Sequence, residues 1–390
     1  MIHQLSEEHS VSRNWRPRSP PMADRQQYTI GWISALSTES VAAQALLDEE
    51  HDDIRIRPQN DNNNYTLGRI GHHNVVIAIL PDGEYGAASA AAVARDMLRS
   101  FPNVRLGLLV GIGSGAPSSK QDIRLGDVVV SSLSGGRGGV FQYDHGKALQ
   151  TGDVSFQHTD FLNQPPMALR TAVAALKSTH IRKGHQLNAK VEEALQKWPR
   201  LKVEYSRPPP ESDRLYKSDI LHANPRHDCG AVCGSDPALL VSRTKRGEYQ
   251  DDPAIHYGLI ASANRLMEDV RVRDRMSAEN GVLCFEMEAA GLMNHFPCLV
   301  IKGISDYADS HKSKEWQGFA AMTAAAYAKE LLSSIPPDQP RQETPSPQLI
   351  SDPLLHKIVI YDTREALAGK THELNMRSDN GKRIKCPNSL

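Results

Sequence analysis

Residues 104–117 read VRLGLLVGIGSGAP, and this stretch decides the fold class. Its first ten residues form a nearly continuous apolar run, which is typical of a strand buried on both faces. The glycines, serine and proline that follow, GIGSGAP, indicate a tight loop. Strands of this kind occur in parallel sheets that helices cover. We therefore expect an α/β protein with a glycine loop at the end of a central strand.

The segments on either side alternate between strand and helix patterns. Upstream, YTIGWISAL (28–36) predicts a strand, and Ser37-Thr38-Glu39-Ser40 opens a helix that the hydroxyls are suited to cap. The other expected elements are a hairpin over 65–80, helices over 86–98, 166–177, 191–197 and 319–333, a strand over 127–132, a long loop over 133–155, and ordered segments at 254–262, 281–293 and 298–309.

Composition excludes several classes of function. The 390 residues carry 45 Lys and Arg against 46 Asp and Glu, so the net charge of −1 supplies no global field for nucleic acid or anionic lipid. No apolar run approaches the ~20 residues that span a bilayer, and residues 1–21 hold no apolar segment typical of a secretory signal. Five cysteines are too few for a disulfide framework. We expect a cytoplasmic protein that binds neither nucleic acid nor membrane.

Local composition and periodicity along the chain predict three regions. Residues 1–27 are polar and aperiodic and are expected to be disordered, whereas 28–335 carry the strand and helix patterns of one domain. Within that domain, 198–253 contains three consecutive prolines and little periodicity, which indicates an insertion. Residues 336–390 form a Pro- and Ser-rich linker and tail.

Acidic or small residues stand at four expected strand ends, where open α/β sheets bind ligands. They are Ser37–Glu39, Gly111–Pro117, Glu286-Met287-Glu288 and Ser305-Asp306. Each has a purely structural explanation, as a helix cap, a tight turn or a carboxylate at a helix start. Four such coincidences at one edge favour a shared pocket.

These motifs together resemble the purine nucleoside phosphorylase and uridine phosphorylase superfamily over residues 28–335. The residues that carry the resemblance are GWISALSTES, the 86–98 helix, LLVGIGSGAP followed by LGDVVVSS, IHYGLIASAN, CFEMEAAGLM and GISDYADS. The motifs are most similar to those of the hydrolytic branch, the methylthioadenosine/S-adenosylhomocysteine nucleosidases. They more narrowly resemble fungal members, in which such a domain stands alone or serves as the N-terminal effector of NLR-like and ankyrin-repeat proteins. The resemblance implies a mixed central sheet flanked by helices, no cofactor, and a homo-oligomer (dimer, trimer or hexamer).

The resemblance also implies catalytic roles. Asp306 matches the general acid that protonates the purine at N7, and Ser305 would orient its carboxyl group. Glu39 matches the carboxylate that deprotonates the attacking water. Glu288 matches the clamp on the ribose hydroxyls, and Met287 would pack on the sugar.

Further residues are implied to contact substrate. Glu286 belongs to the same motif as Glu288, and Gly113, Ser114 and Gly115 would line the sugar side of the pocket. Leu266 and Met267 fall where the nucleosidases contact the base, although SANRLM departs from the usual Ser-Gly-Asp there.

Cleavage of a ribosyl C–N bond passes through an oxocarbenium-like state and needs an acid for the base and a group that activates the nucleophile. A phosphorylase must also bind phosphate, and its relatives do so with arginines in the first loop and before the Gly-Ser motif. Here the first loop, SALSTES, has no arginine, and Val110 precedes Gly111. We therefore expect hydrolysis. The alternatives are a phosphate-dependent phosphorylase and a non-catalytic nucleoside-binding module in signalling.

Two questions about ligands stay open in the sequence. The substrate is a purine nucleoside, such as adenosine or inosine, or a nucleotide, ATP or AMP, for which candidate cations are Arg137, His145, Lys147, Arg243, Lys245 and Arg246. In the insertion, His222, His227, Cys229 and Cys233 have a spacing that admits tetrahedral Zn²⁺. That spacing is irregular and no CxxC pair is present, so we expect free thiols and no metal.

Overall fold

The computed structural model describes residues 24–52, 59–150, 156–159, 161–222 and 229–337. Most of residues 1–27, which were expected to be disordered, and most of the 336–390 linker and tail lie outside these ranges, as does His227. Within them, no helix has the length and apolar character needed to cross a membrane.

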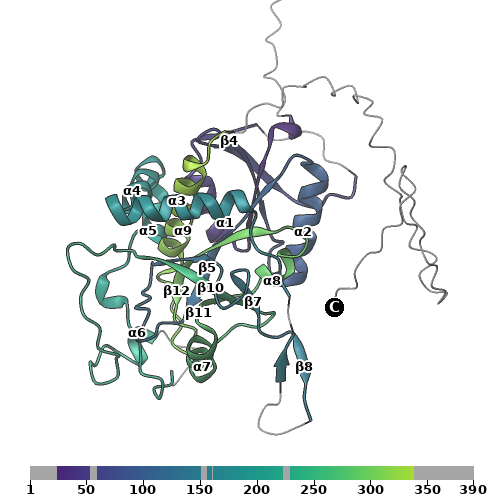
Figure 1. Cartoon of the computed structure of the whole chain (residues 1–390). Coiled ribbons are helices and arrows are strands. Elements are labelled where there is room, and N and C mark those ends of the chain that lie inside the picture. The colour runs from purple at the N-terminus through teal and green to yellow at the C-terminus, as the bar shows by residue number, and fades with distance from the viewer. Residues whose placement is uncertain (1–23, 53–58, 151–155, 160, 223–228, 338–390) are drawn as a thin grey trace, which may run out of the picture. The chain divides into compact units, whose positions relative to one another are not determined.

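The described chain forms one large mixed sheet, a small two-stranded ribbon and helices on both faces (Figure 1). The strands are β1 (Ile30–Ser34), β2 (Glu49–Glu50), β3 (Tyr65–Ile70), β4 (His73–Ile79), β5 (Leu106–Gly115), β6 (Val128–Ser131), β7 (Val140–Gln142), β8 (Gly146–Ala148), β9 (Phe156–His158), β10 (Ile255–Ser262), β11 (Val282–Glu286) and β12 (Cys298–Asp306). The α-helices are α1 (Ser37–Ala45), α2 (Ala87–Ser100), α3 (Met167–Lys183), α4 (Leu187–Lys197), α5 (Lys202–Tyr205), α6 (Cys229–Val232), α7 (Val270–Asn280), α8 (Ala289–Leu292) and α9 (Gln317–Ser334); 3₁₀ turns lie at Arg25–Gln27, Pro199–Leu201 and Pro210–Ser212.

The strand order of the large sheet is β11-β10-β6-β12-β5-β1-β4-β3-β2, with β7 paired to β10. Strand β5 runs parallel to both β1 and β12, whereas β12 is antiparallel to β6. One end of the sheet curls back on itself, because β11 also pairs antiparallel with β5 at Cys284↔Gly115 and Phe285↔Ser114. The carboxyl ends of β5, β11 and β12 therefore meet in one place.

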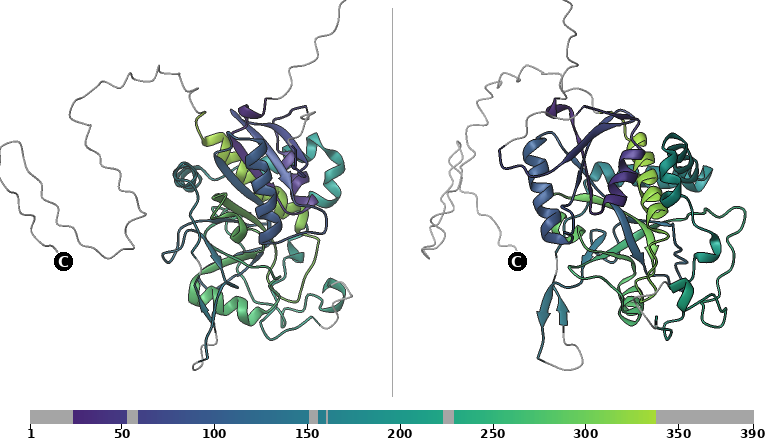
Figure 2. Two further views of the ribbon diagram at one scale, coloured as in Figure 1. Left: turned by 90° about the vertical axis from the view of Figure 1, so that its right-hand side faces the viewer. Right: turned by 180° about the vertical axis from the view of Figure 1, so that it is seen from behind.

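Helices pack closely on both faces of this sheet (Figures 1 and 2). Helix α2 covers one face and contacts β1 and β4, and α1 and α9 cover the other. Close approach depends on small residues: a Cβ at Gly303 of β12 would lie 1.8 Å from the carbonyl oxygen of Ala320 in α9. The mixed α/β fold with helices flanking a central sheet, expected from the sequence, is confirmed.

Three local expectations were wrong. The GIGSG segment is not a loop but the end of β5, because it is paired on both sides by β12 and β11. Residues 133–155 are not loop throughout, since they hold β7 and β8. The hydroxyls at the start of α1 make no capping hydrogen bond; the side chain of Glu39 takes this role at the amides of Ala35 and Leu36.

Candidate functional site

The centre of the candidate site is Lys302, a lysine in the middle of β12 whose side chain is 1% exposed. Its ammonium lies 3.3 Å from Glu286 Oε2 and 3.6 Å from Glu288 Oε2. On the neighbouring strand, its register partner is Gly111 of β5. Glu39 packs directly against that glycine. Three carboxylates, one from α1 and two from the end of β11, therefore lie near one buried ammonium.

Glu39 is held in place by backbone amides on both of its oxygens. Ala35 and Leu36 donate to Oε2 at 2.6 and 3.1 Å, and Ile112 donates to Oε1 at 2.8 Å. A Cβ at Gly111 would lie 2.2 Å from Oε1, so only glycine permits this approach. The carboxylate is thus fixed, and Oε1, which accepts from a single amide, keeps a lone pair for a further donor.

Glu286 and Glu288 bind the backbone differently. Glu286 accepts from the amides of Glu288 and Ala289 at 3.1–3.2 Å, which satisfies the first turn of α8. Glu288 accepts from Gly86 at 3.1 Å through Oε1, which ties it to the start of α2, and from Met287 at 3.3 Å through Oε2. Glu286 therefore caps the start of α8, whereas Glu288 links the end of β11 to the start of α2.

The electrostatics follow from burial and mutual proximity. Burial raises the pKa of Glu39 above its usual range, although Lys302 opposes this shift. Burial raises the pKa of Glu286 in the same way. Burial alone would lower the pKa of Lys302, but Glu286, Glu288 and Glu39 outweigh it and hold the pKa above that of a free lysine. The ammonium is charged at neutral pH, and Glu39 is a stronger base than an exposed glutamate.

Asp306 lies at the end of the same strand, four residues beyond Lys302 and paired with Ser114. Its carboxylate accepts from Ser305 Oγ at 3.2 Å and from the amide of Ala308 at 3.0 Å, and Lys312 Nζ lies 3.5 Å away. Ser305 thus contacts this carboxyl group. The contacts of Asp306 are with its own loop and not with the three glutamates.

Five further predicted site residues fall into two groups. Gly113, Ser114 and Gly115 lie between β11 and β12, where a Cβ at Gly113 would be 3.2 Å from Lys302 Cβ. Leu266 is exposed and Met267 is buried, and both line a cavity of about 740 Å³ beside Asp309 and Ser310.

A larger cavity of about 1340 Å³ lies near the start of β10, and its lining includes none of the predicted catalytic residues. It contains Arg243 and Arg246 of the basic run, but these guanidinium groups are already paired. Arg243 lies 3.0 Å from Asp213, and Arg246 lies 2.5 Å from the buried Asp127. Their ion pairs give both arginines a structural role.

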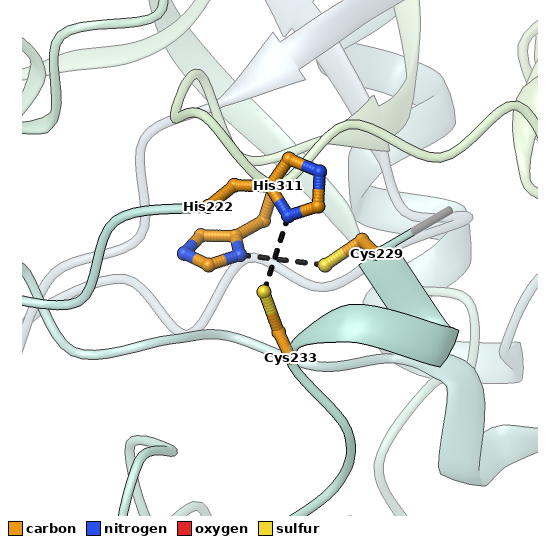
Figure 3. Close-up of side chains that lie close together, drawn as sticks. All are labelled: His222, Cys229, Cys233 and His311. Atoms are coloured by element: carbon orange, nitrogen blue, oxygen red, sulfur yellow. Dashed lines mark hydrogen bonds between the residues drawn. The ribbon is translucent and has the colours of Figure 1, made fainter. Parts of the chain in front are cut away.

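Residues of the insertion meet the loop after Asp306 in a second cluster of chemically active side chains. His222, Cys229, Cys233 and His311 place one ligand atom each within 4.8 Å of all the others (Figure 3). The sequence had singled out the first three, while His311 was missed. Lys302 was missed as well, although a lysine inside the apolar run CLVIKGIS is a visible signal of a buried charge.

Comparison with known proteins gives partial matches. No model of a known protein family matches the chain. It is 45% identical over 321 residues to a nucleotide-binding leucine-rich repeat (NLR)-like protein of the fungus Hyaloscypha variabilis, a match that covers 82% of this chain and 30% of that protein. It is 30% identical over 103 residues to a 5′-methylthioadenosine/S-adenosylhomocysteine nucleosidase of Mycobacterium bovis, which covers 25% of this chain and 40% of the enzyme. The chain thus matches less than half the length of either relative.

Among solved structures, it is similar to the 5′-methylthioadenosine/S-adenosylhomocysteine nucleosidase of Helicobacter pylori, with a TM-score of 0.48, 15% identity, and coverage of 78% of this chain and 98% of that one. Futalosine hydrolase of the same organism has a TM-score of 0.48 and 15% identity, with coverage of 79% and 99%.

Proposed function

We propose that residues 28–335 form a catalytic domain of the nucleoside phosphorylase superfamily that hydrolyses purine N-glycosidic bonds. Water attacks C1′ of the ribose, the C1′–N9 bond breaks, and its electron pair leaves with the purine. Glu39 takes a proton from the water and Asp306 gives one to N7 of the base. The products are a free purine and ribose, or ribose phosphate when the substrate is a nucleotide such as ATP or AMP.

The observation that carries this proposal is the fixed, buried carboxylate of Glu39. Its amide contacts orient both oxygens, and its raised pKa brings it nearer to the working pH, where a general base is most effective. A carboxylate held only to cap a helix would not need to be buried against a glycine of another strand.

The charge balance of the site favours water over phosphate as the nucleophile. Glu39, Glu286 and Glu288 face one ammonium, that of Lys302. Such an excess of negative charge stabilises a developing oxocarbenium ion and repels a phosphate dianion. The arrangement therefore supports hydrolysis over phosphorolysis.

The positions along the sheet separate the two proposed catalytic carboxylates. Glu39 packs at Gly111 of β5, and Asp306 pairs with Ser114 of the same strand, three residues further on. At ~3.3 Å per residue this offset is about 10 Å. Inverting glycoside hydrolases separate their two carboxyl groups by roughly 6.5–9.5 Å to hold a sugar and a water. A ribose clamped by Glu288 would lie between the two.

The similarity to a mycobacterial nucleosidase supports the reaction class, and the 45% identity to an NLR-like protein supports a role as an effector domain in such a protein. We further propose a homo-oligomer. Arg243 and Arg246 already form ion pairs with carboxylates, so they do not indicate whether the substrate carries 5′-phosphates. The substrates to test are therefore adenosine, inosine, guanosine, methylthioadenosine, AMP and ATP.

Steady-state kinetics of purine release test these roles. Asp306→Asn and Glu39→Gln should each lower turnover by roughly 10²–10⁴-fold, while thermal unfolding changes little. The acidic limb of the wild-type pH profile should lie above the ordinary pKa of a glutamate, because Glu39 must lose its proton to act. The matched control is Asp144→Asn. Asp144 contacts Asn264 and Gln142, and this variant should retain the turnover of the wild type. Wild-type turnover in Asp306→Asn would remove the assignment.

A further inference from the structure

We infer that His222, Cys229, Cys233 and His311 bind one structural Zn²⁺ ion. The four side chains come from two parts of the chain that are far apart in sequence. His222 and the two cysteines belong to the insertion, and both cysteines stand in or next to the short helix α6. His311 follows β12 by five residues.

The donor atoms have the spacing of a tetrahedral site. His222 Nδ1 lies 3.1 Å from Cys233 Sγ, and His311 Nδ1 lies 3.3 Å from Cys229 Sγ. These two contacts cross in Figure 3, so the four atoms surround a common point. A tetrahedron with Zn–N and Zn–S bonds of ~2.1–2.3 Å has edges of about 3.4–3.8 Å. Small adjustments of the side chains would complete the coordination.

The surroundings of His311 prepare it as a ligand. Its Nε2 lies 3.0 Å from the carbonyl oxygen of Ile220, which places the proton on Nε2 and leaves the lone pair of Nδ1 directed at the cluster. Tyr216 stacks on the same ring at 3.9 Å with an interplanar angle of 15°. A hydrogen bond from the far ring nitrogen to a carbonyl is the usual support for a metal-bound histidine.

The donor set selects the metal and its role. Two thiolates and two imidazoles are the ligands of structural zinc, whereas calcium and magnesium prefer oxygen. Four protein ligands leave no open position for water, so the ion would stabilise structure and take no part in bond cleavage.

The site would join the insertion to the segment that follows Asp306. Other contacts already link these parts; for example, the amide of His222 donates to Ser310 Oγ at 3.0 Å, and Arg243 donates to the hydroxyl of Tyr307 at 2.8 Å. A zinc ion would add a stronger link at His311 and fix the loop that carries Ala308, whose amide holds the Asp306 carboxylate.

Metal content is the direct test. The full chain, purified through a tag without histidines and without chelators, should contain about one zinc per chain by mass spectrometry of the metal. Cys233→Ala and His311→Ala should lose it. The controls Cys298→Ala, a buried thiol outside the cluster, and His295→Ala, an exposed histidine, should retain it. Equal zinc content in all four variants would overturn the inference.

A second measurement keeps the test valid if the variants do not fold. Zinc-free wild-type protein should take up Co²⁺ to a stoichiometric endpoint and show the visible bands of tetrahedral cobalt with thiolate-to-metal charge transfer. Added zinc should displace the cobalt and raise the unfolding temperature, because the ion binds only the folded chain. The absence of an endpoint with fully reduced protein would contradict the site.

Discussion

Replacing Lys302 with methionine tests the electrostatic centre of the molecule. The ammonium is 1% exposed and is the cationic partner of Glu286 at 3.3 Å and of Glu288 at 3.6 Å. Removing one partner of a buried ion pair costs about 3–5 kcal/mol, because the remaining charge stays desolvated. Methionine has a similar length, so loss of volume adds little. We expect urea unfolding at neutral pH to give a free energy of unfolding lower than wild type by this amount.

The pH dependence of the deficit identifies its cause. Burial raises the pKa of Glu286 and of Glu39, and loss of the Lys302 charge will raise both further. A carboxyl group whose pKa is raised by folding favours the folded state only while it is protonated. The deficit of Lys302→Met should therefore be largest at neutral and alkaline pH and shrink as the pH falls. Adding Glu286→Gln should restore part of the lost stability, since it removes one unpaired charge.

The control for this experiment is Lys329→Met. Lys329 lies 2.7 Å from Asp48, but the two side chains are 16% and 34% exposed. Ion pairs that solvent reaches contribute up to about 1 kcal/mol, and Lys329 Nζ also donates to the carbonyl oxygen of Leu46 at 2.9 Å, so this variant should lose clearly less stability than Lys302→Met. A deficit for Lys302→Met equal to the control, or one that grows toward acid, would refute the reasoning.

Two further predictions concern the neighbourhood of the site. Gly111→Ala should lower turnover by on the order of tenfold or more, because a Cβ 2.2 Å from Glu39 Oε1 displaces the carboxylate; Gly247→Ala, where the nearest atom is 3.8 Å away, should have no effect. Equal activity of the two variants would contradict the proposed role of Glu39. Arg246→Met should cost up to about 3–5 kcal/mol at neutral pH, since it removes the guanidinium partner at 2.5 Å from the fully buried Asp127 and leaves it with His256 at 2.9 Å. The pKa of Asp127 is lowered because His256 and Arg246 outweigh its burial, so its stabilising effect exists above the ordinary carboxyl pKa and is lost as the pH falls. A deficit measured by urea unfolding that persists in acid would count against this explanation.

The sequence predicted the central strands well because their signal is local. The apolar runs of β1, β5 and β12 are so long that these strands must lie in the interior of the protein. The small residues of α2 indicate that this helix packs closely against the sheet. The end of β5 was missed because glycines usually indicate a turn. Here they permit β11 and β12 to pair on either side and let the Glu39 carboxylate contact Gly111, and no pattern within GIGSGAP carries that tertiary reason.

The candidate site was only partly predictable for a related reason. Glu39, Glu288 and Asp306 were identified from a resemblance of motifs, and their roles stay predictions. Lys302 was overlooked because a lysine within a strand pattern is commonly solvated, and only the fold brings three carboxylates to it. His311 was overlooked because its partners lie 78 or more residues earlier in the chain, across the insertion. Contacts between residues this far apart in sequence can be recognised only when the topology of the fold is known.

The most direct test of the proposed function is chromatography of purine release in phosphate-free buffer. Adenosine, inosine, guanosine, methylthioadenosine, AMP and ATP are incubated separately with wild-type protein and with Glu39→Gln, and each reaction is repeated with phosphate added. We predict that wild-type protein releases free base from at least one substrate without phosphate, that added phosphate gives no acceleration, and that Glu39→Gln is nearly inactive. Release that requires phosphate would establish a phosphorylase, and no release from any substrate would favour a nucleoside-binding module; either result contradicts the hydrolytic site around Glu39, Lys302 and Asp306.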